Sequence, residues 1–131
     1  MKRTILTVTM CSALLLAGCG VRPPIEGRMD PYPPKQVHLD SNSLKHETAV
    51  GEPAVARDES GNLYVTVPIR SETDKELYVD YRVTFFDRNR QVLNQTGWYT
   101  KVLSPKVPDQ IMVNSMSPRA DDFQIDFRWA K

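Results

Sequence analysis

LYVDYRVTFF, residues 77–86, is the most regular pattern in this chain of 131 residues. Apolar and polar side chains alternate along it with a period of two, which is typical of a β-strand that buries one face. The inward face is expected to carry Leu77, Val79, Tyr81, Val83 and Phe85. The polar residues 87–90 that follow predict a tight turn, with Asn89 in the left-handed conformation. Residues 91–95 then return antiparallel, so the centre of the domain is predicted to be a β-hairpin.

Further strands are predicted on both sides of this hairpin. Residues 62–70 alternate in the same way and place Leu63, Val65, Val67 and Ile69 inward. Residues 122–129 place Phe123, Ile125, Phe127 and Trp129 inward. Shorter strands are expected over residues 98–103 and 111–116. Because Pro68 has no amide hydrogen for a sheet ladder, the strand at 62–70 is expected to be an edge there or to be ending.

The remaining segments predict turns and irregular chain. Residues 40–46 are polar, residues 47–57 are broken by Gly51 and Pro53, and Ser117 is expected to cap one helical turn over 117–121. No segment shows helical periodicity long enough for an extended helix. Short strands about 8–12 residues apart, joined by turns, predict an all-β fold: an immunoglobulin-like antiparallel β-sandwich. A small barrel is the alternative.

The N-terminus has the features of a secretory signal. Two basic residues, Lys2 and Arg3, precede a short apolar run that ends in small residues and Cys19. The sequence Leu-Ala-Gly-Cys at 16–19 resembles the lipobox of bacterial lipoproteins. This resemblance implies cleavage before Cys19, whose thiol would carry diacylglycerol and whose amino group an acyl chain such as palmitate. In lipoproteins of Gram-negative bacteria, Asp directly after the lipidated cysteine tends to retain the protein at the inner membrane. Here that position is Gly20, so the resemblance implies that the protein lies at the periplasmic face of the outer membrane, or at the cell membrane in a host with one membrane.

The sequence therefore divides into a signal peptide at 1–18, an acylated N-terminus and proline-rich tether at 19–35, and a β-sandwich domain at 36–131. Five of the ten prolines lie in residues 19–34. Proline-rich chain is extended at about 3.1 Å per residue, so the tether could hold the domain about 50 Å from the membrane. Pro31-Tyr32-Pro33-Pro34 could instead be a ligand for an aromatic groove, but the tether is the favoured interpretation.

Composition excludes several kinds of function. Lys and Arg number 17 against 16 Asp and Glu, and loss of Lys2 and Arg3 leaves 15 against 16, a net charge of −1. Without a basic excess, binding to nucleic acid is not expected, and membrane attachment would depend on the lipid at Cys19. The other cysteine, Cys11, lies in the signal peptide, so the mature domain has no disulfide and no thiol chemistry.

No catalytic, metal or cofactor site is predicted, and the chain is not expected to be an enzyme. His38 and His46 are the only histidines, and their spacing does not suit two metal ligands on one strand face. No hydrolase, zinc-protease or phosphate-binding motif is present.

The outward positions of the strands supply a possible partner surface, consisting of Tyr64, Tyr78, Asp80, Arg82, Phe86 and Arg128. If residues 77–86 and 122–129 are neighbouring strands, Asp80 could pair with Arg128, and Arg82 with Asp126. These charged residues would then form a solvated sheet face, which is a simpler interpretation than a surface for a partner. The outward aromatic residues are expected to be covered by residues 36–57 rather than to bind a partner. Trp98 is interpreted as a core residue. The alternative is that its ring belongs to a binding surface.

Residues 79–87, Val-Asp-Tyr-Arg-Val-Thr-Phe-Phe-Asp, followed by a tight turn, resemble the central hairpin of the YcfL-like small lipoproteins. This resemblance covers residues 37–129 and implies an immunoglobulin-like sandwich of uncharacterised function without catalytic residues. In enterobacteria the family's gene lies beside that of a lipoprotein that activates a peptidoglycan synthase, which implies a role in the cell envelope.

Together these features suggest a lipid-anchored, non-enzymatic interaction module that presents its sandwich to another envelope protein. A small-ligand or glycan binder, for example for peptidoglycan fragments, is the alternative, and a purely structural envelope component is the third hypothesis.

Overall fold

The computed structural model describes residues 31–131. The signal peptide, Cys19 and residues 19–30 of the tether lie outside the described residues. The elements, in chain order, are β1 (Val37–Leu39), α1 (Asn42–Glu47), β2 (Thr48–Val50), β3 (Ala54–Arg57), β4 (Leu63–Ser71), β5 (Leu77–Phe86), β6 (Val92–Gln95), β7 (Tyr99–Leu103), β8 (Asp109–Asn114) and β9 (Asp122–Trp129).

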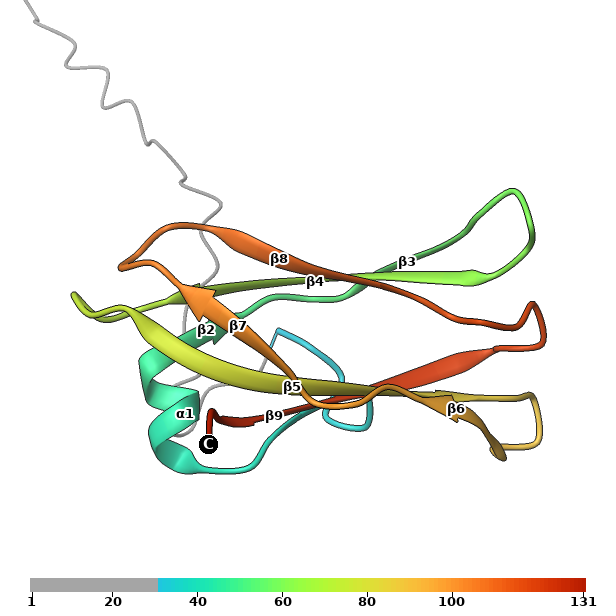
Figure 1. The fold of residues 1–131 in the computed structure, drawn as a ribbon, viewed down its shortest axis with the longest axis horizontal. Helices are drawn as coiled ribbons and strands as arrows, with labels where there is room; N and C mark the ends of the chain where they lie inside the picture. Colours follow the sequence, from blue (N-terminus) through green and yellow to red (C-terminus); the bar gives the residue numbers. More distant parts are fainter. Residues whose placement is uncertain (1–30) are drawn as a thin grey trace, which may run out of the picture.

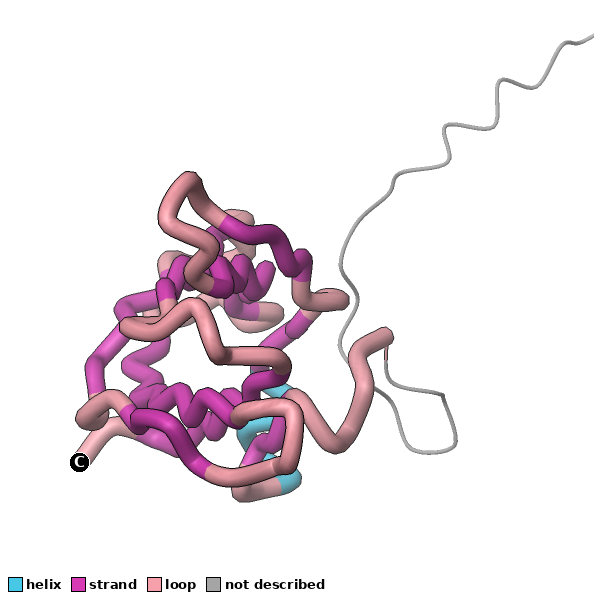
Figure 2. Tube along the Cα trace, turned by 90° about the vertical axis from the view of Figure 1, so that its right-hand side faces the viewer, coloured by secondary structure: helices cyan, strands magenta, loops and turns pink. Residues whose placement is uncertain are grey.

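These strands form two sheets that pack face to face (Figures 1 and 2). In the five-stranded sheet, β5 pairs antiparallel with β9 along one side and with β7 and then β6 along the other. The short β1 extends this sheet beyond β9 as a parallel strand. In the four-stranded sheet, β4 lies between β8 on one side and β2 and β3 on the other. This arrangement confirms the predicted all-β sandwich and is not a barrel.

The core lies between the two sheets and is continuous. Phe85, Phe123 and Phe127 enter it from the five-stranded sheet and are at most 1% exposed. From the other side, β4 buries every second residue, as the alternation at 62–70 predicted. The helix α1 lies at one end of the sandwich (Figure 1), and its Leu44 joins the core cluster. Since no cysteine lies in residues 31–131, apolar packing stabilises the fold, at about 1.5–3 kcal/mol for each large side chain buried.

The prediction that Pro68 marks an edge or the end of its strand was wrong. The strand β4 continues to Ser71 and is central in its sheet, because β8 pairs with it on one side and β2 and β3 pair with it on the other. Pro68 is tolerated because it lies opposite the break between β2 and β3, where its carbonyl accepts a hydrogen bond from the Gly51 amide at 2.9 Å. Residues 62–70 are therefore not a free edge for a partner strand.

Three local predictions also differ from the structure. The polar segment 40–46 contributes to α1, which begins at Asn42. The hydroxyl of the preceding Ser41 caps the Leu44 amide, and after the helix Thr48 Oγ1 donates to the Leu44 carbonyl at 2.6 Å. The turn after β5 has Arg90, not Asn89, at positive φ (65°). Residues 117–121 form a turn in which the Ser117 hydroxyl accepts from the Arg119 amide, without a helix. Within residues 31–131, no helix has the length and apolar character needed to cross a bilayer.

Tyr32, which the sequence placed in the tether, is part of the packed domain. Its side chain is 4% exposed and belongs to the core cluster. The Pro33 carbonyl accepts from the amides of Gln36 and Val37, each at 3.0 Å, which turns the chain into β1. The end of the proline-rich segment is thus held against the sandwich through Tyr32, whereas Pro31, Pro33 and Pro34 stay exposed.

Candidate interaction surface

The outer face of the five-stranded sheet brings together the charged residues that the strand pattern placed outward. In the register of β5 and β9, Asp80 is opposite Arg128 and Arg82 is opposite Asp126. Arg128 Nε lies 3.3 Å from Asp80 Oδ2, and Arg82 Nη2 lies 3.6 Å from Asp126 Oδ2. Both predicted cross-strand pairs are confirmed.

Trp98 covers these pairs from above the sheet. Its ring centroid lies 3.8 Å from the guanidinium carbon of Arg128 and 4.5 Å from that of Arg82, which are cation–π distances. The prediction that Trp98 is a core residue was wrong. The register of β7 on β5 places Trp98 on the outer face of the sheet, away from the core. Tyr99 is opposite Tyr81, so the preceding residue projects on the same outer face as Arg82. Leu103, the buried apolar residue of β7, was the sequence signal that could have fixed this alternation.

Asp80 anchors the cluster and is not a solvated residue of a polar face. It is 6% exposed and accepts a hydrogen bond of 2.7 Å from Thr100 Oγ1 in β7, in addition to the contact with Arg128. The Thr100 hydrogen bond and, to a smaller extent, Arg128 hold the pKa of Asp80 below its ordinary value, although burial acts in the opposite direction. Asp80 is therefore charged at neutral pH and fixes the position of the Arg128 guanidinium beneath Trp98.

Exposed apolar side chains flank this charged centre. Tyr78 and Val102 are directly opposite each other on β5 and β7, and are 52% and 43% exposed. The Tyr78 hydroxyl donates to Glu76 Oε1, and this hydrogen bond raises the pKa of Tyr78, so the phenol stays protonated. Because Tyr78 is half-exposed, the prediction that residues 36–57 cover it was wrong. We call Tyr78, Arg82, Trp98, Val102 and Arg128 the Trp98 surface.

Two predicted surface residues lie elsewhere. Tyr64 is in β4, in the opposite sheet, and its hydroxyl lies 3.0 Å from Met112 Sδ. Phe86 is at the far end of β5, where the guanidinium carbon of Arg90 lies 5.1 Å from the centroid of its ring. The surface thus combines part of the predicted set with Trp98 and Val102, which the sequence did not assign to it.

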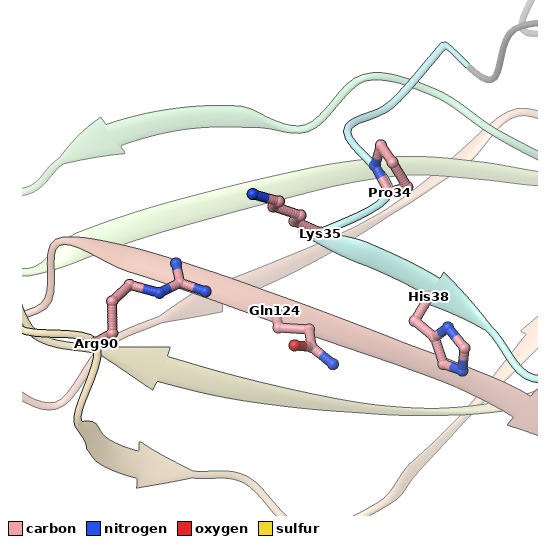
Figure 3. Close-up of a pocket in the computed structure, with 5 residues that line it drawn as sticks. All are labelled: Pro34, Lys35, His38, Arg90 and Gln124. Atoms are coloured by element: carbon pink, nitrogen blue, oxygen red, sulfur yellow. The ribbon is translucent and has the colours of Figure 1, made fainter.

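A shallow groove lies near the other end of the same sheet. It has a volume of about 600 Å³ and is lined by Pro34, Lys35, His38, Arg90 and Gln124 (Figure 3). None of these lining residues is Phe, Tyr or Trp. Among residues 31–131, no three His, Cys, Asp or Glu side chains are grouped so that they could hold a metal ion.

Comparison with known proteins places the chain in a family. Residues 35–128 match the family described as "Protein of unknown function (DUF1425)". The chain belongs to this family. Its fold is similar to the crystal structure of the Campylobacter jejuni protein cj0090, with a TM-score of 0.62 and 22% identity over 73% of this chain and 99% of that one. It is also similar to a DUF1425 family member from Shewanella sp. pv-4, with a TM-score of 0.58 and 22% identity over 64% of this chain and 79% of that one. At this identity the likeness shows the fold alone. No curated protein matches the chain.

Proposed function

We propose that this DUF1425 member is a lipid-anchored, non-enzymatic interaction module that presents the Trp98 surface to another protein of the cell envelope. The observation that carries the proposal is the stacking of two arginines, Arg82 and Arg128, on a partly exposed tryptophan beside exposed Tyr78 and Val102. The lipobox at Cys19 and the resemblance to the YcfL-like lipoproteins support the placement in the envelope.

The physical argument rests on how binding energy is distributed in protein interfaces. Trp, Tyr and Arg are the residue types that carry most of it, and they act from desolvated centres. Here Asp80 and Thr100 hold Arg128, and Arg128 in turn contacts the indole ring. Side chains that are already ordered lose little conformational entropy when a partner binds, so the Trp98 surface is preorganised for docking.

In-cell crosslinking of the tagged full-length protein, followed by mass spectrometry, tests the proposed partner. We expect one envelope protein to be captured repeatedly, and to be lost when Trp98→Ala removes the centre of the surface. Tyr64→Ala is the matched control, because it removes an aromatic ring from the opposite sheet and should leave capture unchanged. Failure to capture any envelope protein, or equal capture by both variants, would contradict the proposal.

The anchor is tested separately by fractionation. Cys19→Ser should release the protein from membranes, and mass analysis of the native N-terminus should show acyl chains on Cys19. Two or more acyl chains hold a protein on a bilayer stably, whereas the residues alone offer no basic cluster to replace them. A Cys19→Ser variant that stays tightly membrane-bound would refute lipid anchoring.

The second candidate function is binding of a small ligand or glycan, and the groove at Lys35 and Arg90 favours it. Its volume of about 600 Å³ is that of a small-molecule site. Sugar rings commonly stack on Trp, Tyr or Phe side chains, however, and none of these lines this groove. If ligand binding were the main function, substitutions in the groove would abolish the cellular role while Trp98→Ala preserved it.

A further inference from the structure

The Lys35–Arg90 groove, defined by its five lining residues, is built from three separate parts of the chain. Pro34 and Lys35 precede β1, His38 lies in β1, Gln124 lies in β9, and Arg90 lies in the turn between β5 and β6. In Figure 3, Lys35 and Arg90 extend toward each other, and Gln124 lies between Arg90 and His38 with its amide directed toward the His38 end of the groove. Residues distant in sequence thus direct polar groups into one concave surface.

The groove carries cationic donors without an acidic lining. None of its five lining residues is a carboxylate. Within residues 31–131, the Lys35 ammonium has no ion-pair partner. Arg90 is paired with Asp122 through Nη1 alone, at 2.6 Å, which leaves its other guanidinium N–H groups available. A site with more charged hydrogen-bond donors than acceptors is suited to bind an oxyanion, because Lys and Arg form charge-assisted hydrogen bonds with carboxylate and phosphate oxygens.

Arg90 is held in place from several directions. The ring of Phe86 lies 5.1 Å from its guanidinium carbon, and Asp122 accepts from it. Asp122 is itself fixed, because its Oδ1 accepts from Gln36 Nε2 at 2.7 Å and from the Phe123 amide at 2.8 Å. These contacts restrain the guanidinium at the groove, with the Arg90 side chain still 60% exposed to a ligand.

The turn that carries Arg90 is fixed as well. Asp87 Oδ1 accepts from the amides of Asn89 and Gln91, at 2.8 and 2.9 Å, and Asp87 is 7% exposed. Arg90 has positive φ at 65°, a conformation that non-glycine residues seldom adopt. Local hydrogen bonds thus hold the backbone in a conformation that directs this arginine toward the groove.

We propose that the Lys35–Arg90 groove binds an oxyanion, a carboxylate or a phosphate group of a small ligand. Lys35 and Arg90 supply the charge. Gln124 supplies an amide whose Nε2 already donates to Asp126 Oδ1 at 3.0 Å, and which keeps a second N–H for the ligand. The imidazole of His38 limits the groove at its far end. This site adjoins the Trp98 surface on the same sheet, because Asp126 accepts from Gln124 and pairs with Arg82, but it does not depend on the protein partner proposed above.

The test is an NMR titration of the full-length protein in detergent micelles. The probes are inorganic phosphate, N-acetylglycine, which offers a peptide-like carboxylate, and sodium chloride at matched ionic strength. We expect saturable shifts of the Arg90 Nε–H, the Gln124 side-chain amide and the Lys35 and His38 backbone amides with phosphate or N-acetylglycine. The tighter of these two probes identifies the natural group as phosphate or carboxylate.

Lys35→Gln is the decisive variant, because Lys35 is exposed and its replacement leaves the core intact. Losing one charge-assisted hydrogen bond should weaken binding by about fivefold or more. Arg88→Gln is the matched control: it also removes one positive charge, from the turn that carries Arg90, is exposed, and does not line the groove. Its affinity should stay within twofold of the unsubstituted chain. Shifts that are reproduced by chloride, that do not saturate, or that respond equally to both substitutions would overturn the proposal.

Discussion

Replacing Arg128 by Met tests whether the Trp98 surface is an ordered cluster or a set of independent exposed residues. The substitution keeps an unbranched apolar side chain but removes the guanidinium. Asp80, 6% exposed, would then keep Thr100 as a hydrogen-bond donor but lose its charged partner, and Trp98 would lose the group 3.8 Å from its ring. Stability and the position of Trp98 should both change.

The expected magnitude follows from the exposure of the pair. The side chains of Arg128 and Asp80 are 22% and 8% exposed, between a surface ion pair and a fully buried one. Surface pairs contribute about 0.2–1 kcal/mol, whereas removing one partner of a buried pair costs about 3–5 kcal/mol. We therefore expect Arg128→Met to lower the free energy of unfolding by about 2 kcal/mol, including the lost cation–π contact.

The pH dependence has a definite sign. The pKa of Asp80 is lower in the folded protein than in the unfolded chain, because Thr100 and Arg128 stabilise its charged form. Its contribution to stability is therefore present above the unfolded pKa, at about pH 4, and is lost as the pH falls through the folded pKa. The difference in stability between the unsubstituted protein and Asp80→Asn should be largest at neutral pH and should shrink on acidification below pH 4.

Urea unfolding, followed by tryptophan fluorescence, measures the loss of stability and its pH dependence. A double-mutant cycle then gives the coupling energy between the two residues. The coupling between Asp80→Asn and Arg128→Met should be about 1–2 kcal/mol at neutral pH. The control cycle uses Arg82→Met and Asp126→Asn, whose side chains are 32% and 14% exposed and whose charged atoms are 3.6 Å apart, and it should give a smaller coupling. Equal couplings in the two cycles, or none for Asp80 and Arg128, would refute the reasoning.

Three further substitutions test other parts of the account. Tyr32→Ala should destabilise the domain by about 3 kcal/mol in thermal or urea unfolding, since Tyr32 is 4% exposed in the core, whereas Tyr78→Ala should change stability little. Asp87→Ala should cost about 1–2 kcal/mol by leaving the Asn89 and Gln91 amides without their acceptor, with Arg88→Ala as a control of small effect. Trp98→Ala should leave the far-ultraviolet circular dichroism unchanged and affect partner capture instead, because Trp98 lies outside the core cluster.

The strands with unbroken alternation were predictable from the sequence. The bounds of β5 and β9 agree with the predicted 77–86 and 122–129, because a period of two over eight or more residues determines both the strand and its buried face. Once these strands were assumed to be neighbours, the pairing of Asp80 with Arg128 followed from residue type and parity. Long-range geometry can thus be read from sequence where the local pattern is strong.

The elements that depend on tertiary contacts were not predictable. The helix α1 has six residues and buries only Leu44, too little for a helical periodicity to emerge. The strands β2 and β3 are short and exist because β4 offers both of its sides for pairing, which also places Pro68 in the interior of the sheet. Tyr32 reads as part of a proline-rich tether because its burial depends on residues far away in the sequence.

The candidate surface was predictable only in part for a similar reason. The charged residues were assigned to one face by strand parity, whereas the outward direction of Trp98 follows from the buried Leu103 only once β7 is known to pair with β5. The groove brings together Lys35, Arg90 and Gln124 through the parallel pairing of β1 with β9 and the turn after β5. Nothing in the local sequence indicates that these residues meet.

Site-specific photocrosslinking in cells tests the central claim most directly. A benzophenone amino acid replaces Tyr78, on the Trp98 surface, or Tyr64, on the opposite sheet, so that the two probes have the same chemistry and a similar size. The account predicts a discrete adduct with an envelope protein from position 78 and none from position 64. An adduct from position 64 alone, or equal adducts from both positions, would contradict it.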